Sequence, residues 1–184
     1  SGYLREYPME QYIRDVKIDS LYEGTTGIQS LDLFFRKIAR DQGQTLSRLA
    51  GEIVELVKGG SDAFEPERQL LGKALEDAQA MVGILVGHAM AFMHEPKEIY
   101  KTGLHTNALL ESLSEVVIAW LLLRHAEIAY NAMPEATGTD KEYYEGKIES
   151  ARFFIRHVAP KIAARLHSAQ LEDAHLMDMS DGAF

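Results

Sequence analysis

Hydrophobic residues recur every three or four positions along most of this chain, which is the spacing of amphipathic helices. The pattern predicts helices over residues 8–18, from 28 onward, 66–95, 104–133 and 140–173. No strand-like alternation of useful length occurs between them. The sequence therefore predicts an all-α fold, organised as a helical bundle.

Glycine and proline mark the expected breaks between these helices. Gly43 is expected to kink the second helix and Pro160 the last one, which Asp140 is expected to cap, while Gly59-Gly60-Ser61-Asp62 predicts a loop. Composition and charge change between about residues 43 and 62, so we expect a first unit over 1–45 and a helical extension over 46–184. Gly83 and Gly87, one turn apart, predict close approach of a neighbouring helix.

Composition narrows the function classes. The 184 residues are 46% hydrophobic and 26% charged, which is typical of a soluble globular protein. There is no cysteine for a thiolate nucleophile or a disulfide, and no uninterrupted apolar run long enough to cross a membrane. No stretch resembles a signal peptide, so we expect a cytoplasmic location.

The net charge of −9 lies entirely beyond residue 49, because the first 49 residues hold equal numbers of acidic and basic side chains. An acidic surface disfavours nucleic acid and anionic membranes as partners. It also disfavours unaided capture of an anionic ligand.

Chemistry is concentrated in Tyr22-Glu23-Gly24-Thr25-Thr26-Gly27, directly before the second predicted helix. Glycine permits close approach of a ligand, and hydroxyl groups with free amides at a helix start can hold an anion such as a phosphate. A carboxylate base beside such a site suits a phosphorylated ligand. The alternative is an ordinary capping loop, in which Thr25 or Thr26 caps the helix and Glu23 is solvated.

Arg5 to Ile18, with Pro8, Glu10 and the Arg14-Asp15 pair, followed by Tyr22-Glu23-Gly24-Thr25 and Ile28-Gln29, resembles the C-terminal catalytic segment of acyl-CoA dehydrogenases. Ser1-Gly2-Tyr3 matches the end of the glycine-rich stretch that precedes this segment in the family. The resemblance covers residues 1–42. Residues 43–184 are similar to the helical C-terminal extension of larger bacterial acyl-CoA dehydrogenases, particularly actinobacterial ones.

The resemblance implies a role for each matched residue. Glu23 is the general base that removes the α-proton of the acyl-CoA, and the backbone amide beside Gly24 binds the thioester carbonyl. Arg14 and Asp15 are expected to be structural, as a buried pair that positions the loop. The remaining matches are flavin-contacting positions, namely Thr25, Thr26, Gly27 and Gly2.

The family also implies an FAD-dependent oxidoreductase of fatty acid β-oxidation that forms a trans-2-enoyl-CoA. It implies a helical N-terminal domain, a middle β-domain, electron-transferring flavoprotein as acceptor, and a homodimer. Because those two domains supply most flavin and coenzyme A contacts, this chain alone is expected to be inactive and not to retain FAD. The rival hypothesis is a non-catalytic helical module for interaction or oligomerisation.

Three further features are expected to carry no chemistry. Tyr144-Glu145-Gly146 repeats part of the motif inside a predicted helix, so Glu145 is expected to be solvated. Glu172 and His175 have the spacing of a di-iron ligand pair but lack a second pair, and we expect no metal site. His88 and His125 are expected to be core histidines with satisfied hydrogen bonds.

Overall fold

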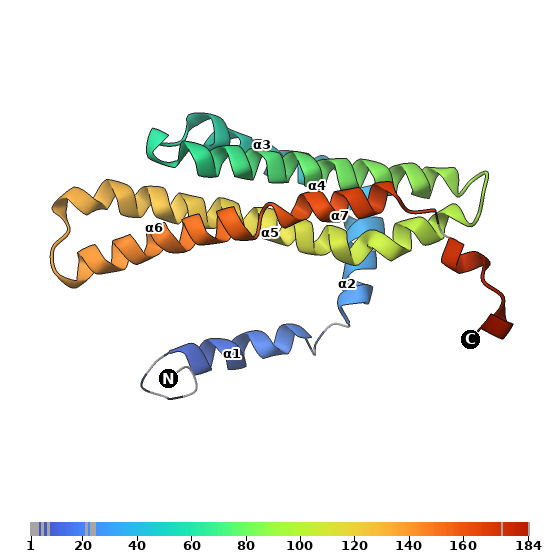
Figure 1. Ribbon diagram of the computed structural model, residues 1–184, viewed down its shortest axis with the longest axis horizontal. Helices are drawn as coiled ribbons and strands as arrows, with labels where there is room; N and C mark the ends of the chain where they lie inside the picture. Colours follow the sequence, from blue (N-terminus) through green and yellow to red (C-terminus); the bar gives the residue numbers. More distant parts are fainter. Residues whose placement is uncertain are drawn as a thin grey trace.

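The computed structural model describes residues 4, 6, 8–20, 22, 25–173 and 175–183, and all regular structure in these ranges is helical (Figure 1). The prediction of an all-α helical bundle is therefore confirmed. The bundle consists of α3 (Gln44–Gly59), α4 (Glu65–Ala91), α5 (Glu98–Ala132), α6 (Thr139–His157) and α7 (Lys161–Gln170). Short 3-10 turns lie at Asp62–Phe64, Met133–Glu135, His175–Asp178 and Asp181–Ala183.

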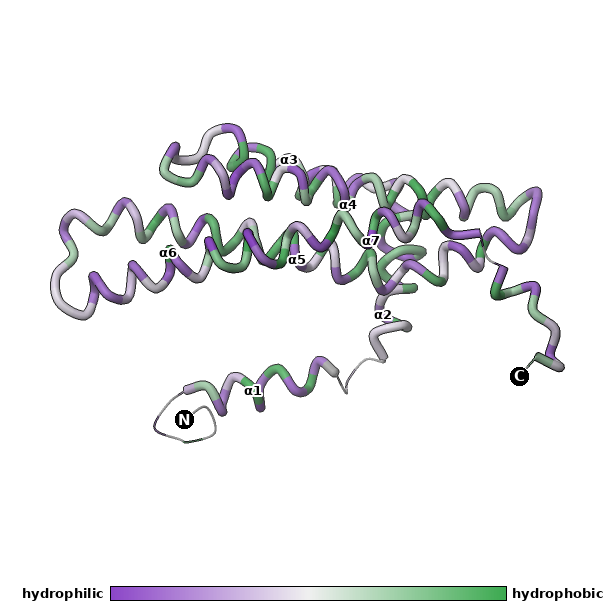
Figure 2. Tube along the Cα trace, in the orientation of Figure 1, coloured by the Kyte–Doolittle hydropathy of each residue, from purple (hydrophilic) through white to green (hydrophobic). Residues whose placement is uncertain are grey.

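The long helix α5 is the centre of the bundle and packs most extensively against α4 and α6. Hydrophobic and polar residues are interspersed along the helices (Figure 2), and many of the hydrophobic ones are buried where helices meet. The main core gathers residues from α3 to α7, among them Leu71, Leu123 and Ile155, each of which is fully buried. A second core lies where α4 and α5 meet the N-terminal arm, and it consists of Phe34, Ile38, Met81, Leu85 and Leu109.

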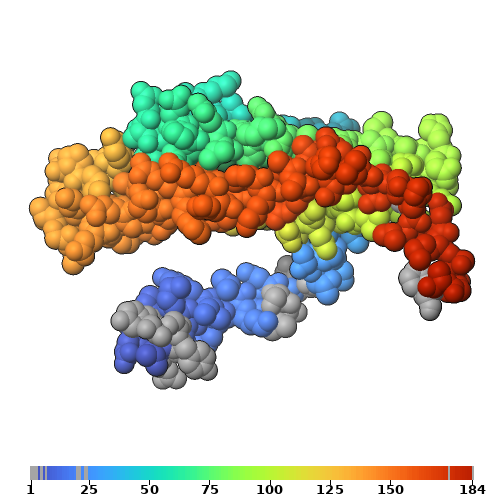
Figure 3. Space-filling view, in the orientation of Figure 1, coloured from blue at the N-terminus to red at the C-terminus, as the bar shows by residue number. Residues whose placement is uncertain are grey.

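The N-terminal arm consists of α1 (Met9–Lys17), a 3-10 turn (Ile18–Ser20), α2 (Thr26–Asp32) and a π-helical continuation, η2 (Leu33–Ala39). No residue of α1 is buried, and this helix lies apart from the bundle on the face shown in Figure 3. In contrast, α2 and η2 pack against α5 and α4. The arm therefore joins the bundle through its second half.

Helix α5 begins at Glu98, six residues before the predicted start, and the contacts of Glu98 favour this earlier start. An acidic residue in the first turn of a helix is favoured by the helix dipole. Lys101 Nζ lies 2.7 Å from the Glu98 carboxylate and His88 Nδ1 lies 2.9 Å from it. The hydrogen bonds from Lys101 and then from His88 hold the pKa of Glu98 below its ordinary value.

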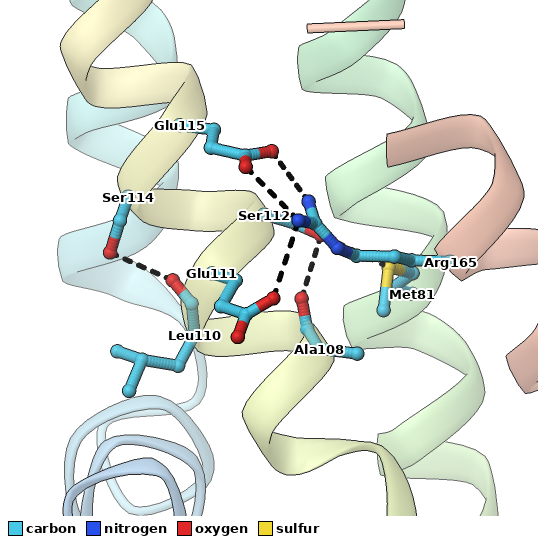
Figure 4. Close-up of polar contacts among 8 residues, drawn as sticks. All are labelled: Met81, Ala108, Leu110, Glu111, Ser112, Ser114, Glu115 and Arg165. Atoms are coloured by element: carbon cyan, nitrogen blue, oxygen red, sulfur yellow. Dashed lines mark hydrogen bonds and ion pairs between the residues drawn. The ribbon is translucent and has the colours of Figure 1, made fainter. Parts of the chain in front are cut away.

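Helix α7 is fastened to α5 by Arg165. Its guanidinium contacts both carboxylate oxygens of Glu115, at 2.5 and 3.0 Å, and lies 3.3 Å from Glu111 (Figure 4). Bidentate pairs of this kind are strong and directional, and the bond to Glu115 holds the pKa of Arg165 above its ordinary value. Next to this pair, Ser112 donates its hydroxyl to the carbonyl of Ala108 at 2.7 Å (Figure 4).

Gly43 produces a full break where a kink was predicted. Gln42 and Gly43 both have positive φ, 57° and 73°, so the chain leaves the arm and begins α3 as a separate helix. The amide of Gly43 donates to the carbonyl of Ile38 at 2.9 Å and to Asp41 at 2.8 Å, which satisfies the end of the preceding helix. The break at Pro160 likewise separates α6 from α7.

Two local predictions are wrong. Asp140 lies in the first turn of α6, and the capping position is Gly138, whose φ of 55° only glycine adopts easily. Gly83 and Gly87 face open space, because a Cβ added at either would meet nothing within 4 Å. The close helix approach occurs at Gly72, where an added Cβ would lie 3.2 Å from Val57 of α3.

Within the described residues, the segment Glu98–Glu135 alone is long and apolar enough to cross a membrane by length and composition. The central helix of a bundle meets the same criterion. Val116, Ala119 and Leu123 of this segment are buried in the main core, so packing accounts for part of its apolar composition.

Candidate functional site

The motif at residues 22–27 lies at the start of α2, in the arm. Thr25, Thr26 and Gly27 belong to the described part of the chain, whereas Gly2, Glu23 and Gly24 lie outside the described residues. The geometry of the site is therefore that of the start of α2, at Thr25 to Gly27, which follows Glu23 and Gly24 directly in the sequence.

Thr25 is the N-cap of α2. Its backbone is extended, with φ −75° and ψ 165°, and its Oγ1 accepts a hydrogen bond from the amide of Ile28 at 3.4 Å. The amide of Gln29 donates to the Thr25 carbonyl at 3.0 Å, which is the first bond of the helix. The amides of Thr26 and Gly27 come before this first bond and have no acceptor within the helix.

The surface around these amides is open. Thr25 and Thr26 are exposed, and a Cβ added at Gly27 would meet only Thr25 Oγ1, at 3.9 Å. Packing within the described chain therefore does not require glycine at position 27. Two hydroxyl groups, free first-turn amides and a glycine with open space beside it form a surface that a polar or anionic group can approach closely.

Ser30 of α2 and Phe34 of its continuation η2 both anchor this segment to the bundle. Ser30 is 1% exposed, and its hydroxyl lies within hydrogen-bond reach of Thr106 and Asn107 on α5. Phe34, one turn further on, is fully buried in the second core. The start of α2 therefore projects from a firmly anchored helix.

Arg14 and Asp15 do not form the buried pair that was expected. Arg14 pairs with Glu10 on α1 at 2.7 Å, and its side chain is 69% exposed. The hydrogen bond to Glu10 holds the pKa of Arg14 above its ordinary value. This pair joins two residues one turn apart and supports α1 locally.

In the second Tyr-Glu-Gly, Glu145 is an exposed residue within α6, as predicted. Glu172 accepts from His105 at 3.1 Å, and His175 lies 3.1 Å from Asp173. Within the described ranges, no group of three or more metal-binding side chains comes together.

The two histidines expected in the core have different environments. His88 is half-buried and bonded to Glu98. His125 is exposed, so its prediction is wrong.

Sequence reasoning missed the contacts of Ser30, Thr106 and Asn107. Ser30 interrupts the apolar stripe of its helix, between Ile28 and Leu31, and this polar residue on an otherwise apolar segment is the only signal in the sequence. Its partners lie 76 and 77 residues away, so the pairing could not be deduced from spacing.

Three comparisons with known proteins bear on this site. Broad-specificity linear acyl-CoA dehydrogenase FadE5 from Mycobacterium tuberculosis is 43% identical over 187 residues, covering 100% of this chain and 31% of that protein. 3-Methylmercaptopropionyl-CoA dehydrogenase from Ruegeria pomeroyi is 32% identical over 168 residues, covering 89% of this chain and 27% of that protein. A butyryl-CoA dehydrogenase from Syntrophomonas wolfei is 27% identical over 186 residues, covering 100% of this chain and 30% of that protein.

The chain thus spans about three-tenths of the length of these relatives. The family model described as acetyl-CoA dehydrogenase C-terminal like matches residues 49–180, which is well over half of the chain and comprises most of the bundle. This chain belongs to the acetyl-CoA dehydrogenase C-terminal-like family, as its resemblance to acyl-CoA dehydrogenases implied.

Proposed function

We propose that this chain is the base-bearing C-terminal part of an FAD-dependent acyl-CoA dehydrogenase, which oxidises an acyl-CoA to a trans-2-enoyl-CoA. The observation that carries the proposal is the match to an acyl-CoA dehydrogenase at 43% identity over the whole chain. That match extends beyond the family model into residues 1–48, which hold the Tyr22-Glu23-Gly24-Thr25 motif.

In this proposal, Glu23 takes the α-proton of the thioester onto its carboxylate. The backbone amide beside Gly24 hydrogen-bonds the thioester carbonyl and stabilises the negative charge that develops as the proton leaves. A double bond then forms between the α- and β-carbons. The bound flavin supplies the acceptor for the hydride that leaves the β-carbon.

The described residues at the start of α2 fit a flavin nucleotide. Thr25 and Thr26 present hydroxyl groups, the first-turn amides are free of intrahelical bonds, and Gly27 has open space beside it. These residues would hold a polar or phosphate portion of FAD, together with Gly2. The parts of the enzyme that supply the remaining flavin and coenzyme A contacts would lie outside this chain, so we expect the chain alone to be inactive.

The test is Glu23→Gln in the intact enzyme, with Glu145→Gln as the matched control. Removing a general base lowers turnover by about 10²- to 10⁴-fold, and we expect a loss in this range with FAD still bound. Glu145 lies in the other Tyr-Glu-Gly, exposed on α6, so its substitution should leave turnover unchanged. Near-normal turnover of Glu23→Gln would remove this residue from the catalytic role.

The bundle itself suits a second, structural role as an interaction module, and a homodimer in the complete enzyme is our proposal. Ile118, Leu121 and Ile128 on α5 are 43%, 39% and 65% exposed, which is a large apolar area to leave in water. Light scattering of the intact enzyme tests the dimer. We further propose electron-transferring flavoprotein as acceptor and a cytoplasmic location.

A further inference from the structure

Ser30 is the one buried residue of α2, on a helix that otherwise exposes Ile28 and Leu31 at 58% and 41%. Its Oγ lies 2.6 Å from Asn107 Oδ1 and 3.1 Å from Thr106 Oγ1, both on α5, and 2.9 Å from the carbonyl of Gly27. A small hydroxyl residue therefore makes a buried polar contact between the motif-bearing helix and the bundle.

Two of the three polar groups within hydrogen-bond reach of the Ser30 hydroxyl belong to α5, and the third is the carbonyl of Gly27. A serine hydroxyl has one proton, and the Thr106 hydroxyl donates to the carbonyl of Gly103 at 3.1 Å. Ser30 donates to Asn107 Oδ1 at 2.6 Å, its shortest contact, and can accept from Thr106 when that hydroxyl turns away from Gly103. Without these partners the hydroxyl would keep only the carbonyl of Gly27, within its own helix, and would lose its directional bonds to α5.

Phe34 lies one helical turn after Ser30 on the same side of the helix, where it is fully buried against Met81, Leu85 and Leu109. An apolar contact alone leaves a helix free to rotate or slide slightly, because it has no direction. The bonds of Ser30 are directional and fix the rotation of α2 about its axis. Thr25 lies five residues before Ser30, about 7.5 Å along the axis at 1.5 Å per residue.

We infer that Thr106 and Asn107, within the C-terminal extension, are positioning residues for the base at position 23: they fix α2 through Ser30 and so fix the start of that helix. The inference rests on the proposed function, because it assigns the extension a part in the same reaction. A displacement of about 1 Å at a reacting group lowers the rate by about 100-fold, so a modest rotation of α2 has a large effect.

The test uses the intact flavoenzyme with Thr106→Val, which keeps the shape and removes the hydroxyl, and Thr106→Ser, which retains the hydroxyl. Thr106→Val should lower kcat by about 10- to 100-fold with KM within about twofold and FAD content unchanged. Thr106→Ser should restore most of kcat. An increased kinetic isotope effect for substrate deuterated at the α-carbon in Thr106→Val would place the defect in proton abstraction.

Ser112→Ala is the matched control. Ser112 is also buried on α5, but its hydroxyl bonds Ala108 and the sulfur of Met81 and does not reach α2 (Figure 4). It should reduce thermal stability without changing kcat. An equal loss of kcat in Ser112→Ala, or no recovery in Thr106→Ser, would overturn the inference.

Asn107→Ala provides a second variant if Thr106→Val does not fold, because Asn107 is an exposed residue whose removal leaves no cavity in the core. It should reduce kcat as Thr106→Val does, and add little to Ser30→Ala when the two are combined. Unchanged kcat in Asn107→Ala contradicts the inference. If Glu23→Gln is inactive while these variants are normal, the proposed function stands and the positioning role fails; if Glu23→Gln is active, the proposed function fails first.

Discussion

Arg156 on α6 pairs with Glu67 on α4, and this pair supports a specific prediction about stability. Glu67 is 1% exposed, and its Oε1 accepts from Arg156 Nε at 2.7 Å, with Arg156 Nη2 at 2.5 Å. Within the described residues, the other oxygen of Glu67 is buried without a hydrogen-bond partner. Arg156→Ala therefore leaves a buried carboxylate with no counter-charge.

The magnitude follows from the exposure of the two side chains. Removing one partner of a fully buried pair costs about 3–5 kcal/mol, because the remaining charge stays in a low-dielectric site. The Arg156 side chain is 51% exposed, so water reaches the pair from one side, and we expect the lower end, about 3 kcal/mol. For a chain of this size, that corresponds to a fall in Tm of about 6–12 °C.

The assay is thermal unfolding followed by circular dichroism for wild type, Arg156→Ala, Glu67→Gln and the double variant. Because the loss comes from an unpaired charge, Glu67→Gln in the Arg156→Ala background should recover part of it. Glu149→Ala, on the same helix with a side chain that is 68% exposed, should cost less than about 1 kcal/mol. A Tm for Arg156→Ala within about 2 °C of wild type, or no recovery in the double variant, would refute this reasoning.

Two other predictions test a close approach and a pKa. Gly60→Ala should lower the free energy of unfolding by about 1–3 kcal/mol, measured by denaturant titration, because the added Cβ would lie 2.8 Å from the Leu56 carbonyl. Gly59→Ala is the control: its added Cβ would meet nothing within 4 Å, so this change should be neutral or slightly stabilising. Hydrogen bonding and charge from Lys97 hold the pKa of Asp178 below its ordinary value. The pair therefore stabilises the tail fully at a pH above the ordinary pKa of an aspartate, and this stabilisation is lost as the pH falls through the lowered pKa. NMR titration of Lys97→Met should show the Asp178 pKa rising towards its ordinary value, and an unchanged pKa would contradict the assignment.

The parts of the fold that local sequence determines were predicted well. The first helix was predicted over residues 8–18 and forms over Met9–Lys17, and the break at Gly59–Gly60 follows from residues that terminate helices. Local pattern could not show that Gln42 adopts a positive φ, since non-glycine residues rarely do, and so the break at Gly43 was predicted only as a kink.

The candidate site divides in the same way. The Tyr22-Glu23-Gly24-Thr25 motif is contiguous and could be found from the sequence, as could the exposed position of Glu145 on a helix. The anchor of α2 could not, because Ser30 and Thr106 are 76 residues apart and only the folded bundle brings them together. The same reason explains Gly60, which was predicted only as part of a loop and is closely packed by Arg68 and Glu127.

The position of these two features in the bundle separates effects on stability from effects on rate. The Glu67–Arg156 pair joins α4 to α6. In contrast, α2 and its continuation η2 meet the bundle through Ser30, which contacts α5, and Phe34, which lies in the second core. Substitutions at Glu67 should therefore change the unfolding free energy and leave kcat of the folded enzyme unchanged, because no contact of α2 is altered. Substitutions at the contacts of Ser30 should change kcat more than they change stability. A bundle that acted only as an interaction module would give no such difference between the two sets.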